Sequence, residues 1–300
     1  MLDITLIGTG GTMPRKDRFL ASCLLNVNGH SVLIDCGEGT QVSFKICGRK
    51  MKPIDMICFT HFHADHITGL PGLLLTMGNE GRTEPVTIVG PVGLTKTVRD
   101  ICVAAPNLPF TLCFRELTEL KPFVSGALTV TPFRAKHSIP CIGYTLELPH
   151  RGKFDIAKAQ KNNVPMKIWS ILQKEDTVCF EGNIFTSDMV LGAPRKSIKL
   201  TYCTDSRPTE AIWSAAKNAD LLICEGMYSD DSKLPLAKEK GHMLFSEAAR
   251  LAKSAGVQKL WLTHFSPSLD DPQSGLALAQ EIFSDTECGF DGKSITLKFV

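Results

Sequence analysis

Three histidines and an aspartate fall within six residues of one another, in the segment His61-Phe62-His63-Ala64-Asp65-His66. The segment directly follows an apolar run over 54–59 that predicts a buried strand. Imidazole nitrogens combined with a carboxylate suit Zn²⁺, with Mn²⁺ or Fe as alternatives. Four ligands from one short loop cannot surround a single tetrahedral ion, so the spacing predicts two ions. Each would take two of these ligands: His61 with His63, and Asp65 with His66.

Each ion then needs ligands from distant parts of the chain, and polar residues just after apolar strands are the candidates. Three such residues follow predicted strands over 127–133, 198–203 and 259–262: His137, Asp205 and His264. We expect the loops that carry them to open on the same edge of the fold as the 61–66 loop.

The elements that must position these residues alternate between strands and helices in both halves of the chain. Strands over 23–27 and 31–34 flank Asn28-Gly29, a strong hairpin signal. Helices are expected over 40–47, 67–77, 92–103, 209–217, 245–254 and 274–283, and a last strand over 294–299. The pattern predicts an α/β fold with two packed sheets and helices outside, a four-layer αββα sandwich that forms a single domain over 1–300.

Composition restricts the class of protein. Hydrophobic residues make up 43% of the 300 residues and charged residues 21%, as in ordinary globular proteins. No apolar run reaches the roughly 18–20 residues of a membrane helix, and the N-terminus shows no signal-peptide pattern. The eleven cysteines form no C-x-x-C motif, so we expect reduced, mostly buried thiols and a cytoplasmic protein. A net charge of +2 gives no overall attraction for nucleic acid, so an RNA substrate would need a local basic patch.

One segment departs from the alternating pattern. From 150 to 195 the chain is polar, lysine-rich and weakly periodic, and between 151 and 174 it carries six basic residues and a single acidic one, Asp155. A basic segment on an exposed insertion can contact backbone phosphates without reading bases. The alternative is a solvated loop.

The sequence resembles the metallo-β-lactamase superfamily through H-x-H-x-D-H at 61–66 with His137, Asp205 and His264. Within it, the sequence resembles the ribonuclease Z family, the endonucleases that mature tRNA 3′ ends. The narrower resemblance depends on five further segments: L-I-G-T-G-G at 6–11, P-R-K-D-R at 14–18, D-C-G-E-G-T-Q at 35–41, G-L-P-G-L-L at 69–74 and C-T-D-S-R at 203–207. Six positions, at four places in the chain, differ from the family pattern. Ala64 replaces a glycine, 204–206 reads T-D-S in place of G-D-T, Phe19 replaces an asparagine, and Met166-Lys167 replaces the Gly-Pro of the family's tRNA-gripping arm.

The resemblance implies a role for each matched residue. One zinc ion would be bound by His61, His63 and His137, a second by Asp65, His66 and His264, and Asp205 would bridge the two. Asp35 would hold ligand imidazoles by their other ring nitrogen. Asp65 would orient the nucleophile or accept its proton, and His242, oriented by Glu225, would protonate the departing oxygen. The P-x-K-x-R loop and the 150–195 arm would bind substrate: Arg18, Lys153, Lys158, Lys161 and Lys167.

The implied reaction is hydrolysis of precursor tRNA that leaves a 3′-hydroxyl on the tRNA and a 5′-phosphate on the trailer, by a homodimer. Three alternatives remain open from the sequence. The same metals could serve a small-molecule or cyclic-nucleotide phosphodiesterase, against which only the P-x-K-x-R loop and the basic arm argue. A thioester or lactam hydrolase would leave Glu225 and His242 without a role. A non-enzymatic RNA-binding protein would leave the ligand set unexplained.

Overall fold

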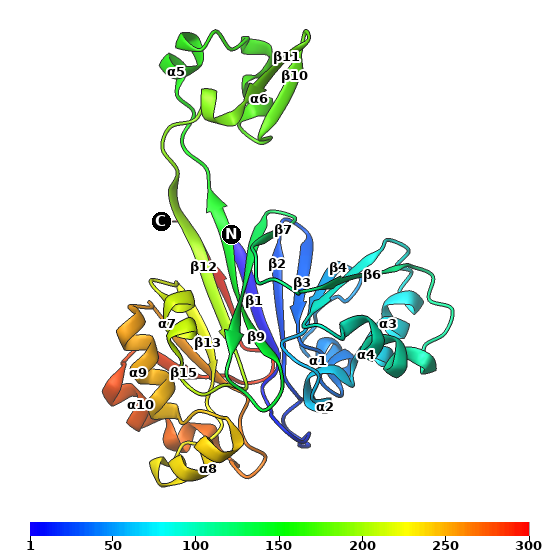
Figure 1. The fold of residues 1–300 in the computed structure, drawn as a ribbon, viewed down its shortest axis with the longest axis vertical. Coiled ribbons are helices and arrows are strands. Elements are labelled where there is room, and N and C mark those ends of the chain that lie inside the picture. Colours follow the sequence, from blue (N-terminus) through cyan, green and yellow to red (C-terminus); the bar gives the residue numbers. More distant parts are fainter. Residues whose placement is uncertain (300) are drawn as a thin grey trace. The chain divides into compact units, whose positions relative to one another are not determined.

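The computed structural model describes residues 1–299, which form two compact units (Figure 1). The main unit comprises residues 1–147 and 199–298, and the inserted unit comprises residues 148–198 with Phe299. Both are built from short elements, and each has a hydrophobic core of its own. No helix of the described chain is long and apolar enough to cross a membrane.

The first sheet contains the N-terminal strands. Its order is β16 (Ser294–Leu297), β1 (Leu2–Gly8), β2 (Ser22–Val27), β3 (His30–Ile34), β4 (Ile54–Cys58), β5 (Val86–Gly90) and β6 (Leu112–Glu116). Pairing is antiparallel from β16 to β3 and parallel from β3 to β6. The predicted hairpin is confirmed: β2 and β3 pair around Asn28 and Gly29, both of which have a positive φ that such a turn requires.

The second sheet has the order β15 (Thr286–Cys288), β14 (Leu260–Thr263), β13 (Leu221–Glu225), β12 (Arg195–Cys203), β9 (Cys141–His150), β8 (Leu128–Ala135) and β7 (Phe123–Ser125). Its strands β12 to β15 are parallel, whereas β7, β8 and β9 form an antiparallel meander. Parallel strands place their carboxyl ends at one edge of a sheet, so the loops after β12, β13 and β14 lie together.

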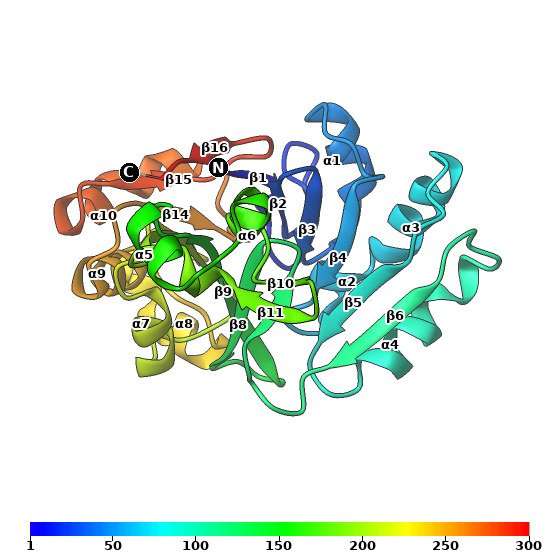
Figure 2. The same cartoon turned by 90° about the horizontal axis from the view of Figure 1, so that it is seen from above.

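Helices cover the outer faces of both sheets, which gives the predicted α/β sandwich (Figure 2). On the side of the first sheet lie α1 (Thr40–Ile46), α2 (Ala64–Ile67), α3 (Leu70–Asn79) and α4 (Leu94–Ile101). On the other side lie α7 (Glu210–Ala216), α8 (Leu234–Lys240), α9 (Phe245–Ala255) and α10 (Leu276–Ile282). Between the sheets the buried Tyr144 of β9 donates its hydroxyl hydrogen to the carbonyl of Phe59, 2.7 Å away, and so ties the second sheet to the end of β4.

The single helix expected over 67–77 is two helices. Residues 64–67 form α2, the chain turns at Thr68 and Gly69, and α3 begins at Leu70 with Pro71 in its first turn, where the missing N–H costs nothing. Gly69 is required at this turn, because a Cβ would come within 2.0 Å of the Gly37 carbonyl oxygen. The break lets the histidine loop end in its own short helix.

The inserted unit is more ordered than its polar composition suggests. It contains α5 (Ile156–Lys161), α6 (Trp169–Leu172) and a hairpin of β10 (Thr177–Phe180) with β11 (Asn183–Thr186). Asp155 caps α5 by accepting the backbone N–H of Lys158. A small core holds these elements together: Ala159, Val164, Ile168, Leu172, Val190 and Leu191.

Candidate metal centre

Every predicted metal ligand is carried by a segment that leaves a strand at one edge of the two sheets. The histidine loop follows β4, His137 follows β8, Asp205 follows β12 and His264 follows β14. The chain turns sharply at two of these ends, where Asp205 and His264 have φ values of 52° and 57°. Left-handed backbone at residues other than glycine costs energy and is common at functional sites. Here it turns both side chains into a shared centre.

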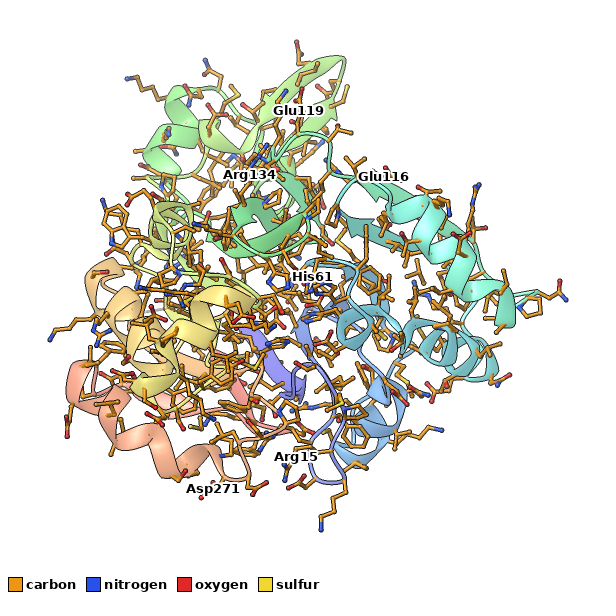
Figure 3. The ribbon with its side chains drawn as sticks, turned by 60° about the horizontal axis from the view of Figure 1, so that its bottom comes forward. Arg15, His61, Glu116, Glu119, Arg134 and Asp271 are labelled. Carbon is orange, nitrogen blue, oxygen red and sulfur yellow. The ribbon has the colours of Figure 1, made fainter. Side chains whose placement is uncertain are left out.

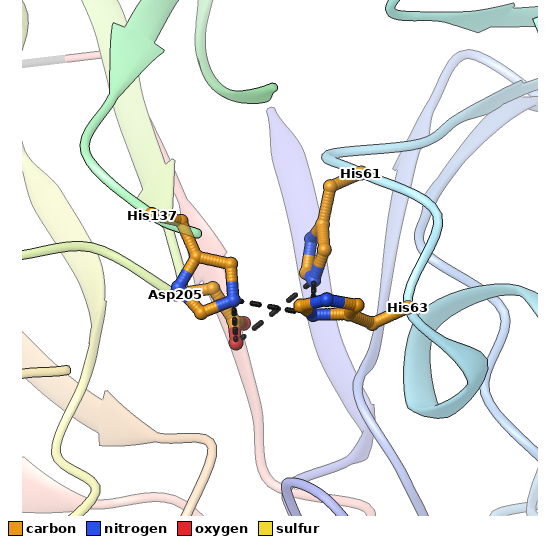
Figure 4. Close-up of side chains that lie close together, drawn as sticks. All are labelled: His61, His63, His137 and Asp205. Carbon is orange, nitrogen blue, oxygen red and sulfur yellow. Dashed lines mark hydrogen bonds and ion pairs between the residues drawn. The ribbon is translucent and has the colours of Figure 1, made fainter. Parts of the chain in front are cut away.

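Four side chains form the first ligand group: His61, His63, His137 and Asp205 (Figure 4). The Nδ1 atom of His63 lies 3.0 Å from His61 Nε2 and 3.2 Å from His137 Nε2. Asp205 Oδ1 lies 4.0 Å from His61 Nε2 and 3.7 Å from His137 Nε2. These potential ligand atoms all lie within 4.8 Å of one another.

The second group contains Asp65, His66 and His264. The Nε2 atoms of His66 and His264 are 3.1 Å apart, and Asp65 Oδ2 is 3.3 Å from His264 Nε2. The other oxygen of Asp205, Oδ2, lies 3.0 Å from His66 Nε2 and 3.2 Å from His264 Nε2. Asp205 therefore presents one carboxylate oxygen to each group, which is the geometry of a bridging ligand.

The chemistry of this donor set fits metal cations. The carboxylate of Asp35 can only accept a hydrogen bond, so His66 donates from Nδ1 (2.9 Å) and turns Nε2 toward the other ligands. Asp205 Oδ2 is buried without a hydrogen bond of normal geometry, although buried polar atoms are nearly always satisfied. Imidazole nitrogens that face one another at 3.0–3.2 Å, around a buried carboxylate oxygen, leave lone pairs that a cation would satisfy.

The pKa values of the ligand side chains also indicate that a positive charge is stabilised in this centre. Burial lowers the pKa of His61 to about 2, helped by the neighbouring His66, so this ring is a neutral donor. Burial also opposes the charged form of His66, but Asp205 and Asp35 outweigh it and raise the pKa of His66 well above its ordinary value. For Asp205, burial opposes ionisation, yet the surrounding imidazoles hold its pKa well below the usual range. Four carboxylates lie in or beside the centre: Asp35, Asp65, Asp205 and Glu225. Each of their described ion pairs is with a histidine, and none is with a lysine or arginine.

A buried carboxylate orients the second group from behind. Asp35 follows β3, is fully buried, and accepts the backbone N–H of Thr60 (2.8 Å) and the Thr60 hydroxyl (2.9 Å). Thr60 Oγ1 in turn lies 3.0 Å from His61 Nδ1. Asp35 therefore contacts one predicted ligand directly and reaches another through Thr60, a residue that the sequence alone did not single out.

A second acid–histidine pair lies beside the ligands. His242 donates from Nδ1 to Glu225 Oε2 over 2.9 Å, and Glu225 is fully buried at the end of β13. Burial opposes the charged imidazole, but Glu225 outweighs it and raises the pKa of His242. The His242 side chain also lines the pocket in front of the ligands.

The loop after β1 closes the centre from another side. Thr12 donates its backbone N–H to Asp65 Oδ2 over 2.6 Å, and does so with a φ of 69°, an unusual conformation for a β-branched residue. Gly11 lies so close to His264 that a Cβ would come within 2.6 Å of the imidazole. The backbone of the glycine turn at 8–11 thus lies directly against the ligand His264, and only glycine fits at position 11.

An open pocket of about 520 Å³ leads to the centre. Its lining includes the predicted ligands His63, Asp65, His137 and Asp205, and also side chains that sequence reasoning missed: Tyr228, Lys240 and Ser266. Lys240 ends the short helix α8, which carries no apolar periodicity strong enough to predict it. Its ammonium group pairs with Glu239 Oε1 over 2.9 Å.

The predicted substrate-binding residues have different surroundings. Arg18 is 6% exposed, and its guanidinium donates to the carbonyls of Leu269 and Asp270, so its described contacts hold the 266–271 loop. Its neighbour Arg15 lies toward the rim of the main unit near Asp271, whereas His61 lies in the interior (Figure 3). In the inserted unit, Lys153, Lys161 and Lys167 are exposed, while Lys158 donates to the Leu191 carbonyl.

The sandwich with this histidine–aspartate cluster at one edge defines a metal-dependent hydrolase of the metallo-β-lactamase superfamily. A family model described as "Beta-lactamase superfamily domain" matches residues 186–265, and one described as "Anti-Pycsar protein Apyc1" matches residues 2–105. Ribonuclease Z of Agathobacter rectalis is 51% identical over 300 residues, covering 100% of this chain and 99% of that protein. Ribonuclease Z of Clostridium acetobutylicum is 47% identical over 309 residues, with the same coverage. The chain belongs to the ribonuclease Z family.

Solved structures agree with this assignment. The short form of human tRNase Z superposes with a TM-score of 0.71 at 25% identity, covering 99% of this chain and 100% of that one. The metallo-β-lactamase fold protein YhfI from Bacillus subtilis superposes with a TM-score of 0.70 at 20% identity, covering 98% of each chain. The second likeness shows the shared fold alone.

Proposed function

We propose that this enzyme is a zinc-dependent endonuclease that removes the 3′ trailer from precursor tRNA. The products are a tRNA with a 3′-hydroxyl and a trailer with a 5′-phosphate. The observation that carries the proposal is the pair of ligand groups bridged by Asp205, next to the Glu225–His242 pair, in a chain that matches ribonuclease Z proteins over its full length.

His61, His63, His137 and Asp205 would hold one ion, and Asp65, His66, His264 and Asp205 the other. When bound, such ions supply positive charge that polarises the phosphodiester and makes a nucleophile available at neutral pH. Nitrogen-rich ligation favours zinc, and Mn²⁺ or Fe is the alternative.

Asp65 would orient the attacking water or accept its proton. Its Oδ2 is held by the Thr12 N–H, and the side chain lines the pocket. Burial opposes ionisation of Asp65, but hydrogen bonds from His264 and His66 lower its pKa, so it is a carboxylate at neutral pH. Attack on phosphorus breaks the bond to O3′.

His242 would protonate the departing O3′. Its Nδ1–H is held by Glu225, which leaves the Nε2 proton for transfer into the pocket. A ribose oxygen is a poor leaving group, so this proton matters for RNA and much less for an aryl ester.

The inserted unit is proposed to bind the tRNA outside the cleavage site. Residues 148–198 contain eight lysines and arginines and five aspartates and glutamates, whereas the whole chain has a net charge of only +2. The exposed Lys153, Lys161 and Lys167 would contact phosphates, with Lys158 beside them. Together with Arg18, these residues complete the proposed substrate-binding set. We also propose a cytoplasmic homodimer, which light scattering at defined concentration would test.

Incubation with a precursor tRNA, followed by mapping of both new ends, tests the proposal. The expected result is one cut at the 3′ end of the acceptor stem, with the termini stated above, which His63→Ala abolishes. Hydrolysis of a generic phosphodiester without tRNA cleavage would support the small-molecule phosphodiesterase instead.

A further inference from the structure

The three residues Asp205, Ser206 and Arg207 each contact a different part of the site. Asp205 bridges the two ligand groups. Ser206 donates its backbone N–H to Glu225 Oε1, the acid that holds His242. Arg207 reaches past both to the backbone of His242 itself, with its Nη1 donating to the His242 carbonyl.

The backbone of this segment is fixed to Lys136, which lies between the end of β8 and His137. The Arg207 N–H donates to the Lys136 carbonyl over 3.1 Å, and the Lys136 N–H donates to Ser206 Oγ over 2.8 Å. Ser206 Oγ donates in turn to the Arg207 carbonyl. Arg207 therefore extends from a rigid part of the metal centre.

The guanidinium is anchored at its far end as well. Arg207 and Glu247 form a two-pronged ion pair, with Nη1 2.8 Å from Oε2 and Nη2 bonded to Oε1. Both side chains are only 13% exposed. Glu247 also accepts the Leu244 N–H over 3.0 Å at the start of α9. A planar guanidinium held by two parallel bonds has one orientation, and that orientation presents a donor to His242.

His242 lies in the short link between α8 and α9, and the next residue, Met243, accepts the Met227 N–H over 3.0 Å. The His242 N–H donates to the Ala237 carbonyl and its ring donates to Glu225. Glu225 determines the direction of the ring, but a ring can keep that bond while its backbone shifts. The Arg207 bond to the carbonyl removes this freedom.

We infer that Arg207 is a positioning residue that holds the proton donor His242 at a fixed place relative to the metal centre. The inference rests on the proposed function, in which His242 protonates the leaving oxygen. A shift of about 1 Å in a group that transfers a proton can cost about 100-fold in rate. Loss of Arg207 should therefore slow reactions that need the proton and spare those that do not.

The test compares a substrate with a poor leaving group, precursor tRNA, and one with a good leaving group, bis(p-nitrophenyl) phosphate. Arg207→Met should lower the single-turnover rate on tRNA by roughly 10–100-fold. The ratio of the rate on tRNA to the rate on the aryl diester should fall at least tenfold. Metal content and KM for tRNA should stay unchanged. Arg207→Lys should recover part of the loss, because the positive charge and an N–H donor group remain but the planar two-pronged guanidinium is lost. The matched control Arg250→Met, an exposed arginine on α9, should change neither rate.

Arg207→Met leaves Glu247 without its partner and could fail to fold. The variant Arg207→Met with Glu247→Gln removes the unpaired charge and keeps an acceptor for the Leu244 N–H. It should show the same shift in the rate ratio.

A double variant separates positioning from a general structural role. If Arg207 acts through His242, then Arg207→Met added to His242→Ala should cause almost no further loss on tRNA. A full additional loss, an equal fall on both substrates, or loss of metal would overturn the inference. If the wild-type protein does not cut tRNA at all, the proposed function fails. If the wild type cuts tRNA and Arg207→Met cuts it as fast, the inference alone fails.

Discussion

The Nδ1 atom of His242 lies 2.9 Å from Glu225 Oε2 and 3.8 Å from Asp205 Oδ1, so His242 lies directly beside both carboxylates. Glu225 ends β13 and Asp205 follows β12, and these two strands are parallel neighbours. Parallel strands β12, β13 and β14 thus bring Asp205, Glu225 and His264 to the same edge of the sheet.

The first prediction concerns His242 alone. His242→Ala should slow tRNA cleavage by roughly 10²–10⁴-fold, the usual loss for a general acid, because the leaving O3′ would depart without a proton. Hydrolysis of bis(p-nitrophenyl) phosphate should fall far less, and the metal content should stay unchanged. His30→Ala is the control, since this exposed histidine pairs with Asp55 away from the site. Equal losses on both substrates would show that His242 is not the acid.

Asp35 should affect metal affinity and not the chemical step. Asp35→Asn keeps the volume but weakens the hold on His66 Nδ1, and such changes typically lower metal affinity by about 10–100-fold. Competition with a chelator of known affinity would measure the change. Saturating metal should restore most of the activity. Asp55→Asn, which removes a carboxylate that pairs with His30, should leave metal affinity as in the wild type.

The histidine loop and the strands around it could be predicted from sequence because their signals are local and dense. An apolar strand followed by H-x-H-x-D-H leaves few interpretations, and the more distant ligands each follow an apolar run. The meeting of these residues within 4.8 Å depends on strand order, which no local pattern specifies. The sequence included Arg207 in the matched segment at 203–207 but gave it no role, and Thr60 was not singled out, because their partners lie far away in sequence or are backbone atoms.

The inserted unit was the weakest part of the prediction. Its helices α5 and α6 have six and four residues, too short for helical periodicity to be visible. Its core combines alanine, valine and isoleucine with partly buried aromatic residues such as Trp169, spread among lysines. Such a core stabilises a small fold only through tertiary contacts, which composition does not reveal.

Removal of the inserted unit should separate binding from chemistry. Deletion of residues 153–191 joins Gly152 to Gly192, which lie close together: the Gly192 N–H donates to the Lys153 carbonyl over 2.8 Å. Binding of tRNA should weaken, and its salt dependence should flatten by about 0.7–0.9 in logarithmic slope for each phosphate that the protein no longer neutralises. Hydrolysis of the aryl diester should continue, because no predicted ligand is deleted.

A charge control accompanies the deletion. Changing Lys153, Lys161 and Lys167 to glutamine should reproduce most of the loss in affinity. The same change at three exposed lysines of the main unit, Lys50, Lys121 and Lys253, should have little effect. An unchanged affinity and salt slope after the deletion would identify the unit as a solvated appendage.

Glu287 lies on the edge strand β15 of the second sheet and should make the free energy of unfolding depend on pH. Burial opposes its ionisation, but Lys259 and Lys293 outweigh it and lower its pKa to about 2 from 4.5. A depressed folded-state pKa stabilises the protein above about pH 4.5, and this contribution is lost as the pH falls toward 2. Glu287→Gln should therefore reduce the free energy of unfolding at pH 6, by less than about 1 kcal/mol since the side chain is 38% exposed. Urea unfolding should show this difference shrinking with acidity, and a pH-independent difference would contradict the assignment.

We propose that two bound metal ions, held by the two ligand groups around Asp205, drive cleavage of precursor tRNA. Stepwise addition of Zn²⁺ to metal-stripped protein, with the rate of correctly mapped tRNA cleavage recorded at each step, tests it directly. We expect no cleavage without metal, and a cleavage rate that rises until two equivalents of Zn²⁺ per chain have been added. Full activity in metal-free protein, or a rise complete at one equivalent, would contradict it.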